Sequence, residues 1–329
     1  MRPRPGNGAA AILAQHQKAF TQRFTAGRVY RPAQTFGRYQ AQFNPLPQRR
    51  CALSESELDR FHSAADRWRV AVEQMRESDT SVLGFGTRGG EAVVLKVVRR
   101  GLDEWEAGPI TAAFRGQGMV RVLDQEPGAL LLERLYPGIP LVGLVLEGRD
   151  QAATQVLADV IQSMHEVPST WPAATTLSQL GAAFERYIES GDTQIHSELV
   201  WDARSRYLRL CRTQRRQRLL HGDLQHSNVL FDERRGWIAV DPKGLNGELE
   251  YEVGAMFRNP KEAPDLYPQP ATIERRLKVL SSEIELDGAR TLEWLYTQAV
   301  LSAVWTIEDG GAPEEATIRL AVAARDLLG

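Results

Sequence analysis

The spacing of apolar residues changes several times between residues 54 and 135. Leu58–Met75 has the periodicity of one helix face, and Ser54-Glu55-Ser56-Glu57 before it is a capping-box signal. Ser81–Gly86 and Glu91–Val98 are short, apolar and rich in strand-forming residues. Thr87-Arg88-Gly89-Gly90 between them is typical of a hairpin turn. This stretch therefore predicts a helix followed by two paired strands.

The pattern then predicts a helix over Asp103–Arg115 and two more strands, Met119–Asp124 and Ala129–Leu135, joined at Glu126-Pro127-Gly128. After Pro137-Gly138 the spacing becomes helical. The segments with helical spacing are Asp150–His165, Thr176–Ser190, Leu199–Leu219, Thr272–Glu285, Gly288–Ile307 and Pro313–Leu328. We therefore expect an α+β chain with a small lobe of sheet and helix over residues 54–137 and a mostly helical lobe over residues 138–329.

Composition restricts the class of protein. The chain has 329 residues, of which 43% are hydrophobic and 25% charged, as in ordinary globular proteins. Its longest apolar stretch, Ile139–Leu146, is far shorter than the roughly 18 residues of a membrane span. The two cysteines, Cys51 and Cys211, cannot form a disulfide framework and, with the six histidines, give no zinc spacing. We expect a cytoplasmic protein without a membrane contact.

Charge is unevenly distributed. Residues 1–50 contain nine basic and no acidic residues, which leaves 31 basic and 42 acidic residues in the rest. We expect residues 1–53 to form a disordered basic tail. The acidic body suits a cationic small molecule better than nucleic acid, although solubility alone also explains it. The seven arginines between Arg204 and Arg218 form either a nucleic-acid patch or a solvated helix face, and we favour the second.

The clearest chemical signal is His221-Gly222-Asp223-Leu224-Gln225-His226-Ser227-Asn228, followed by Asp241. Val229–Phe231 and Trp237–Val240 predict a hairpin that returns Asp241 to the side of Asn228. Phosphoryl transfer uses such a set, with one carboxylate that accepts the hydroxyl proton and an amide and a second carboxylate that hold Mg²⁺. The pattern His-x-Asp-x4-Asn is that of the catalytic loop in protein-kinase-like folds. The alternative is a surface turn with chance polar residues.

A nucleotide site also needs a cation for the phosphates. Lys96 lies within the apolar strand Ala92–Val98, where an unpaired lysine is costly, so we expect a carboxylate partner. Glu104 in the following helix is the first choice and Glu106 the second.

Two other segments complete the predicted nucleotide site. Gly84-Phe85-Gly86 is a candidate for the loop over the phosphates, although it lacks the fuller glycine pattern. Leu131–Leu135, with Glu133 at its centre, is the candidate hinge, whose backbone would bond adenine.

These motifs together resemble those of the aminoglycoside 6-phosphotransferases, a group of streptomycin and hydroxyurea-resistance kinases. The resemblance lies in His221–Asn228, in Trp237–Glu248 with Asp-Pro-x-Gly in place of Asp-Phe-Gly, and in Met256–Pro260. It extends to Asp103-Glu104, Gly116–Leu123, Leu131–Glu133 and Leu301–Trp305, and runs from about Trp68 to the C-terminus. It implies a protein-kinase-like two-lobe fold.

The resemblance also implies roles for single residues. Asp223 would act as base, Asn228 and Asp241 as Mg²⁺ ligands, Lys96 as the phosphate ligand and Glu104 as its partner. The implied cofactors are ATP or GTP together with Mg²⁺. Gln225 stands where many members have His, and Ser227 where Gly or Glu is common, which bears on the substrate pocket.

A cationic sugar requires carboxylates near the base and an aromatic wall. The candidates are Gln225, Glu248, Glu250, Glu252, Trp305, Glu308 and Asp309. Three functions are open at this point: phosphorylation of an aminoglycoside, foremost streptomycin; phosphorylation of another hydroxylated metabolite; and a non-catalytic role in nucleotide binding or in an interaction through the basic tail. The complete set of Lys96, Asp223, Asn228 and Asp241 argues against the third. A protein kinase is disfavoured because no Ala-Pro-Glu segment follows Asp241.

Overall fold

The structure is a computed structural model that describes residues 55–329 except 79, 101–102, 165, 168–170 and 172–173. The predicted basic tail, residues 1–53, lies outside the described residues. Within the described part of the chain, no helix combines the length and apolar character needed to cross a membrane.

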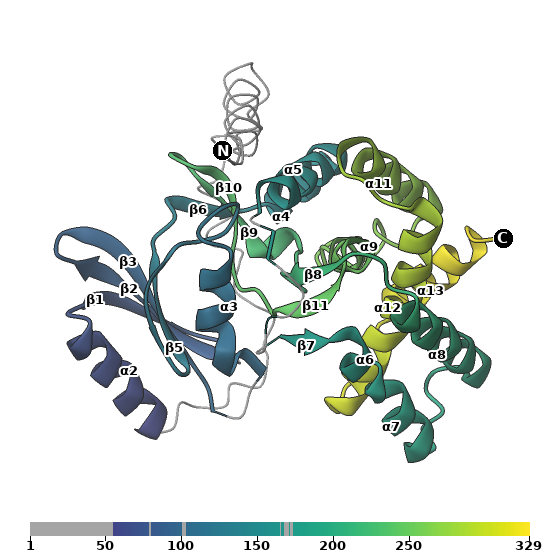
Figure 1. The fold of residues 1–329 in the computed structure, drawn as a ribbon, viewed down its shortest axis with the longest axis horizontal. Helices are drawn as coiled ribbons and strands as arrows, with labels where there is room; N and C mark the ends of the chain where they lie inside the picture. The colour runs from purple at the N-terminus through teal and green to yellow at the C-terminus, as the bar shows by residue number, and fades with distance from the viewer. Residues whose placement is uncertain (1–54, 79, 101–102, 165, 168–170, 172–173) are drawn as a thin grey trace, which may run out of the picture. The chain divides into compact units, whose positions relative to one another are not determined.

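The small lobe is built on a five-stranded antiparallel sheet of order β1-β2-β3-β5-β4 (Figure 1). Its strands are β1 Ala71–Glu77, β2 Ser81–Arg88, β3 Glu91–Val98, β4 Val122–Glu126 and β5 Ala129–Glu133. The short helix η2 Asp103–Glu106 and helix α3 Ala107–Ala113 separate β3 from β4. The predicted sheet is thus confirmed, although β4 begins at Val122 instead of Met119.

The N-terminal part of this lobe corrects the sequence prediction. Helix α2 covers Glu55–Arg67, and the predicted helix over Leu58–Met75 is wrong beyond that point. Arg69 has a positive φ of 55°, and Val70 donates its N–H to Ala65 O, so the chain turns back there. The following residues form β1, which pairs along its length with β2. Pairing with the next strand in the chain therefore overrides the helical spacing.

The two faces of the sheet have different surroundings. Residues opposite one another on neighbouring strands share a face. Lys96 pairs with Leu83 and Leu130, and Val94 pairs with Phe85 and Leu132, so these side chains share one face. The other face carries Val82, Val93, Leu95, Val97 and Leu131, which form one core cluster with Phe61, Ala64 and Trp68. Helix α2 therefore covers the face of the sheet that is turned away from Lys96. Figure 1 shows α2 beside this sheet.

The large lobe is mainly helical and contains two three-stranded sheets. Its helices are α4 Val142–Leu146, α5 Asp150–Ser163, α6 Leu177–Leu180, α7 Ala182–Ser190, α8 Ser197–Arg212, η3 His226–Asn228, α9 Leu249–Glu252, α10 Gly254–Phe257, α11 Pro270–Glu283, α12 Gly288–Glu308 and α13 Glu315–Asp326. The sheets are β10-β9-β6, with β6 Pro137–Pro140, β9 Val229–Asp232 and β10 Gly236–Ala239, and β7-β11-β8, with β7 Thr175–Thr176, β8 Gln217–Leu220 and β11 Leu245–Glu248. Strand β6 spans the expected lobe boundary and pairs with β9 of the large lobe.

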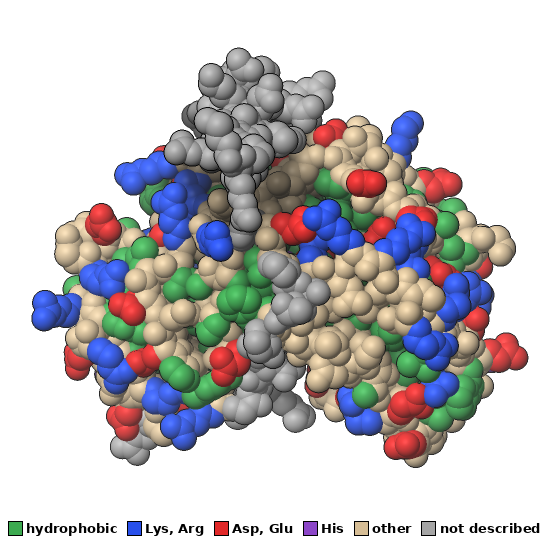
Figure 2. Space-filling model, in the orientation of Figure 1, with side chains coloured by type: hydrophobic (Ala, Val, Ile, Leu, Met, Phe, Trp, Pro, Cys, Tyr) green, Lys and Arg blue, Asp and Glu red, His purple; other side chains and the backbone are tan. Residues whose placement is uncertain are grey.

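The arginine-rich segment does not form one helix over Leu199–Leu219. Helix α8 ends at Arg212, and Gln217–Leu220 is strand β8, paired with β11. The arginines are largely matched by carboxylates: Arg204 with Glu185, Arg206 and Arg209 with Glu293, Arg215 with Asp287, and Arg216 and Arg218 with Glu166. Basic and acidic side chains are interspersed over this lobe in Figure 2. The interpretation as a solvated, ion-paired face fits this arrangement better than a nucleic-acid patch.

The fit of α2 on the sheet can be tested at Gly84. A Cβ added there would lie 2.5 Å from Phe61 Cζ, and Phe61 is fully buried, so it has little room to move. Gly84→Val should therefore destabilise the protein by about 1–3 kcal/mol, seen as a lower Tm in thermal unfolding. Adding Phe61→Leu should recover part of the loss, because it shortens the opposing side chain. Thr87→Val in the same strand is the control, and an unchanged Tm for Gly84→Val would contradict the packing of α2.

Candidate active site

The loop between β8 and β9 carries the predicted catalytic motif. It leaves β8 at Leu220 and ends in η3, whose last residue is Asn228. The β9–β10 hairpin then returns the chain, and Val240 donates its N–H to Asn228 O at 2.9 Å. Asp241 follows directly, so the predicted hairpin brings Asp241 back to Asn228.

Asp223 and Asn228 are bonded to each other within this loop. Asn228 Nδ2 donates to Asp223 O at 2.8 Å and to Asp223 Oδ2 at 3.0 Å. Gln225 Nε2 lies 3.4 Å from the same carboxylate oxygen, at the limit of a hydrogen bond. Because the Asn228 amide nitrogen is engaged, its oxygen is the atom left to bind a cation. The Asp223 carboxylate is thus held in place by the Asn228 amide.

Lys96 joins the two lobes. Its Nζ lies 2.8 Å from Glu104 Oε2 of η2 and 2.8 Å from Asp241 Oδ1 of the large lobe. Lys96 is only 4% exposed. Burial opposes its charged form, but the Asp241 and Glu104 carboxylates outweigh this and raise the pKa of Lys96. The lysine is thus a fixed cation, and Glu104, not Glu106, is its helical partner.

Asp241 combines backbone strain with access to solvent. Its φ is +57°, the left-handed region that few residues other than glycine adopt. Its side chain is 49% exposed although one oxygen bonds Lys96. Such strain is common where a side chain must point into a functional site.

The donor set fits Mg²⁺ better than a transition metal. Among the described residues, no group of three or more His, Cys, Asp or Glu side chains is placed to hold a metal ion. One carboxylate and one amide oxygen suit a hard cation that keeps waters and takes its other ligands from phosphates. Asn228 and Asp241 are the residues that fit this description.

Glu252 holds the start of the β8–β9 loop by accepting two backbone hydrogen bonds. Its carboxylate accepts the N–H of His221 at 2.6 Å and that of Gly222 at 3.0 Å. Glu252 is 3% exposed, and this burial raises its pKa to about 7 despite the two amide donors. The sequence suggested Glu252 as a substrate ligand; the structure corrects this, because both oxygens bond the loop backbone.

His221 is buried and links the C-terminal end of β8 to the C-terminal end of β10. Its Nδ1 accepts the N–H of Asp223 at 3.3 Å, so Nε2 carries the proton and donates to Val240 O at 2.8 Å. Burial lowers the pKa of His221, which keeps the ring neutral. The ring therefore fixes the distance between the Asp223 loop and the segment that leads to Asp241.

Two glycines allow the site's segments to approach each other. Gly222 has φ +82°, and a Cβ there would lie 2.6 Å from Leu245. Gly244 has φ +75°, and a Cβ there would lie 2.6 Å from Ile110 of α3. Gly244 also donates its N–H to His221 O at 3.0 Å. The glycine of Asp-Pro-Lys-Gly thus allows the large lobe to meet the helix that follows Glu104.

Gly84 and Gly86 do not form a loop over the phosphates. Both lie inside β2, where Gly84 pairs with Leu95 and Gly86 with Val93. A Cβ at Gly86 would lie 2.1 Å from Ala71 O, so this glycine permits the close approach of β1. The sequence prediction is wrong here because strand packing, not a phosphate, requires these glycines.

In the predicted hinge, the backbone N–H of Glu133 is not available to bond adenine. Glu133 donates its N–H to Arg121 O, and its carboxylate accepts the N–H of Arg121 and pairs with Arg235. Glu133 is therefore committed to protein contacts. Two residues later, Leu135 N–H has no protein partner among the described residues.

The substrate candidates separate into buried and accessible residues. Glu248 is 1% exposed and accepts bonds from Arg290, Trp294 and the Arg215 N–H, so it supports the fold and is not free for a substrate. Glu250 is also buried and accepts the Asp287 N–H.

Three other candidates, Trp305, Glu308 and Asp309, lie at the C-terminal end of α12. Glu308 forms a two-point ion pair with Arg186, at 2.8 and 3.0 Å, and the following Asp309 is exposed. Trp305 lies under Lys243, whose Nζ is 5.7 Å from the ring centroid. Lys243 belongs to the Asp241–Gly244 turn, so this contact brings Trp305 to the candidate site. Lys243 was not among the site residues predicted from the sequence.

A second buried cluster behind the catalytic loop was also missed. Arg276 is 1% exposed, pairs with Asp150 at 2.6 Å, and donates to the carbonyls of Met256 and Asn259. His226 of η3 is fully buried, and burial with the nearby Arg276 lowers its pKa to about 3. Asp150 and Arg276 are 126 residues apart, so no local pattern could have linked them.

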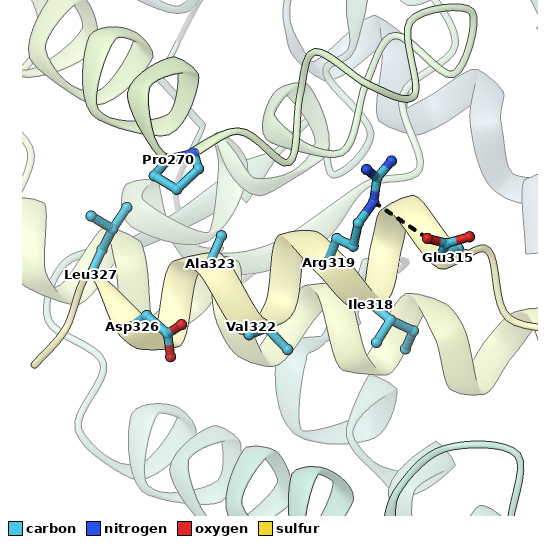
Figure 3. Close-up of a pocket in the computed structure, with 8 residues that line it drawn as sticks. All are labelled: Pro270, Glu315, Ile318, Arg319, Val322, Ala323, Asp326 and Leu327. Atoms are coloured by element: carbon cyan, nitrogen blue, oxygen red, sulfur yellow. Dashed lines mark ion pairs between the residues drawn. The ribbon is translucent and has the colours of Figure 1, made fainter.

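A hollow on the C-terminal helix is separate from this site. It has a volume of about 400 Å³ and is lined by Pro270, Glu315, Ile318, Arg319, Val322, Ala323, Asp326 and Leu327 (Figure 3). None of these residues belongs to the catalytic loop or to the Lys96 ion pairs. The geometry of the polar groups therefore identifies the site, and the hollow does not.

The chain is similar to known kinases and phosphotransferases over most of its length. The family model for aminoglycoside/hydroxyurea antibiotic resistance kinases matches residues 67–310. The streptomycin 3''-kinase of Klebsiella pneumoniae is 32% identical over 250 residues, which are 74% of this chain and 91% of that protein. The streptomycin 6-kinase of Streptomyces glaucescens is 30% identical, over 83% of this chain and 89% of its own. The hydroxyurea phosphotransferase of Kitasatospora aureofaciens is 32% identical, over 74% and 72% respectively.

The fold is also found among solved structures. Aminoglycoside phosphotransferase APH(4)-Ia, in its ternary complex with AMP-PNP and hygromycin B, aligns with a TM-score of 0.58 and 16% identity. The alignment covers 82% of this chain and 99% of that one. At this identity the likeness concerns the fold, and it confirms the expected protein-kinase-like two-lobe architecture.

Replacing Glu252 tests its protonation. Its pKa is about 7 in the folded protein against 4.5 for the unperturbed group, so between these values the folded state binds a proton that the unfolded state has lost. The stability contributed by this group is full below about pH 4.5 and falls as pH rises to about 7. Glu252→Gln removes the titration. The native-minus-variant difference in unfolding free energy should decrease across that window, by at most about 3 kcal/mol. Denaturant unfolding of both proteins from pH 5 to 8 measures it, and a constant difference would refute the assignment.

Proposed function

We propose, since the chain belongs to the aminoglycoside/hydroxyurea antibiotic resistance kinase family, that it phosphorylates a hydroxyl of an aminoglycoside, with streptomycin the foremost substrate. The observation that supports this most strongly is the convergence of Lys96, Glu104 and Asp241 beside Asp223 and Asn228. That set contains each group that γ-phosphoryl transfer from a nucleoside triphosphate requires. ATP and GTP are both compatible with it.

The nucleotide would lie against the Lys96 face of the sheet. Leu83, Phe85, Val94 and Leu132 share that face and offer the base an apolar surface. The N–H of Leu135, for which the described residues provide no backbone acceptor, would donate to the base edge in place of the engaged N–H of Glu133. Lys96 would bond the phosphates through the ammonium that now bonds Asp241. Glu104 would keep Lys96 in place during that exchange.

The acceptor hydroxyl would bind next to Asp223. The proton of the hydroxyl passes to the Asp223 carboxylate as the acceptor oxygen bonds the γ-phosphorus and the bond from phosphorus to the β–γ bridging oxygen breaks. Asn228 holds the Asp223 carboxylate by its amide N–H. Bound Mg²⁺, held by Asn228 and Asp241, would neutralise phosphate charge. The transfer is direct, without a phosphoenzyme.

The acceptor would contact Gln225, Trp305, Lys243 and Asp309. Gln225 reaches toward Asp223, and Lys243 with Trp305 forms a wall beside the Asp241 turn. Asp309 and Glu308 provide carboxylates for a cationic substrate, with Glu308 shared with Arg186. Relatives named for the 3'' and the 6 position of streptomycin are comparably similar, so either hydroxyl is a candidate.

Hydroxyurea is the second candidate acceptor. One relative of comparable identity is named for it. Moreover, three of the five acidic residues proposed from the sequence, Glu248, Glu250 and Glu252, are committed to internal contacts. A smaller and less charged acceptor would not need them.

Turnover with defined acceptors tests the proposal. Streptomycin, other aminoglycosides and hydroxyurea are each incubated with the full-length protein and Mg²⁺-ATP, and product mass and NMR identify the phosphate and its position. We expect streptomycin to gain one phosphate. Phosphate transfer to hydroxyurea alone would establish the second candidate, and transfer to none of the acceptors would refute the proposal.

Asp223→Ala tests the chemistry separately from the substrate. Turnover should fall by about two or more orders of magnitude, because the base acts mainly in the transition state, while nucleotide binding persists. Asp326→Ala, which removes an exposed carboxylate from α13, is the control. Native-like turnover of Asp223→Ala would contradict the assignment of the base.

A further inference from the structure

Helix α2 lies outside the family match, apart from its last residue, yet it is part of the small lobe's core. The match begins at residue 67, whereas α2 covers Glu55–Arg67. Phe61 and Ala64 on this helix are fully buried in the cluster that includes Val93 and Leu95 of β3. Val93 and Leu95 alternate along the strand with Lys96 and Val94 of the opposite face. The helix is therefore packed directly behind the strand that carries the phosphate-binding lysine.

Arg60 of α2 bonds three separate segments of the lobe. Its Nη1 donates to Val98 O at the end of β3 at 3.0 Å, and its Nη2 donates to Gly128 O in the β4–β5 turn at 3.1 Å. Its guanidinium carbon lies 4.6 Å from the centroid of the Trp105 ring in η2. This contact lies within the range of a cation–π interaction.

Arg60 and Trp105 both pack closely against the backbone of Gly128. Its φ is +73°, and a Cβ there would lie 2.6 Å from both the Arg60 guanidinium and the Trp105 ring. Gly128 also donates its N–H to Trp105 O at 3.1 Å. We call Arg60, Trp105 and Gly128 the Arg60 cluster. It binds η2 through both the side chain and the backbone of Trp105.

The Arg60 cluster adjoins the Lys96 ion pair in sequence and in space. Trp105 follows Glu104, whose carboxylate lies 2.8 Å from Lys96 Nζ. Helix η2 has only four residues, and a helix this short has little stability of its own. Tertiary contacts must therefore fix its position, and Trp105 provides a well-defined set of them.

We propose that Arg60 is a positioning residue for phosphoryl transfer: through Trp105 it holds η2 so that Glu104 stays on Lys96. Helix α2 thereby becomes a support for the nucleotide site, although it lies on the opposite face of the sheet. This inference rests on the proposed function for its kinetic consequences. It predicts that loss of Arg60 weakens the use of the nucleotide and leaves the acceptor site intact.

Arg60→Met tests the proposal, because it keeps the aliphatic stem and removes the guanidinium. Arg67→Met is the matched control: it lies on the same helix and removes an exposed ion pair to Glu126 without touching Trp105. We expect Arg60→Met to lower kcat/KM for Mg²⁺-ATP about tenfold or more, with the KM of the acceptor unchanged. Arg67→Met should stay within about twofold of the native protein, as expected for an exposed pair.

Further variants separate positioning from simple destabilisation. Arg60→Lys keeps a cation near the Trp105 ring and should recover part of the loss. Trp105→Leu should reproduce the effect of Arg60→Met, and the double variant should lose no more than the larger single loss, because both act through one contact. Assays are run well below the Tm of every variant. Equal kcat/KM for Mg²⁺-ATP in Arg60→Met and Arg67→Met, or an equal rise in the KM of the nucleotide and the KM of the acceptor in Arg60→Met, would overturn the proposal.

A direct binding measurement keeps this inference separate from the proposed function. If the native protein transfers phosphate to no acceptor, the proposed function fails, and calorimetric Kd values for Mg²⁺-ATP are compared instead. A weaker Kd for Arg60→Met but not for Arg67→Met would support the positioning role. Identical Kd values in the native protein and Arg60→Met would refute it.

Discussion

The arrangement of the site depends on one buried cation. Lys96 is almost fully enclosed, and its ammonium is bonded by carboxylates from two distant parts of the chain, Glu104 of the small lobe and Asp241 of the large lobe. A buried lysine without partners would be strongly destabilising, so the charge requires η2 and the Asp241 turn to meet at β3. The same contacts leave a cation where the phosphates of a nucleotide would bind. Stability and proposed chemistry thus require the same geometry.

The loop that carries Asp223 is held by a network of hydrogen bonds from neighbouring side chains. Glu252 binds the backbone at His221 and Gly222, and neutral His221 bridges from Asp223 N–H to Val240 O. Asn228 bonds both the carbonyl and the carboxylate of Asp223. Each of these interactions restrains a backbone segment or a side chain near the proposed base. Catalysis by proximity and orientation requires that the base be held in place before the substrate binds.

The sequence was most informative where function fixes residue type and spacing together. His221–Asn228, Asp241, Lys96 and Glu104 were all expected to meet, and the structure brings them together. Prediction failed where the reason for a residue lies in a distant partner. Gly84 and Gly86 were taken for a phosphate loop, but they make room for Phe61 and for the β1 backbone. Glu248 was taken for a substrate ligand, but it is buried by Arg290 and Trp294, 42 and 46 residues away in the chain. Local spacing also could not show that β1 pairs with β2 or that Arg60 reaches Trp105.

The Mg²⁺ dependence of nucleotide binding in Asp241→Asn tests the proposed site most directly. In that site the phosphates would release Asp241 from Lys96, and Asp241 would then hold Mg²⁺ together with Asn228. Calorimetry would compare the Kd of ATP with and without Mg²⁺ in the native protein and in the variant. We expect Mg²⁺ to tighten ATP binding to the native protein and Asp241→Asn to lose most of this gain, since a neutral amide replaces the carboxylate. An equal gain from Mg²⁺ in both proteins would contradict it.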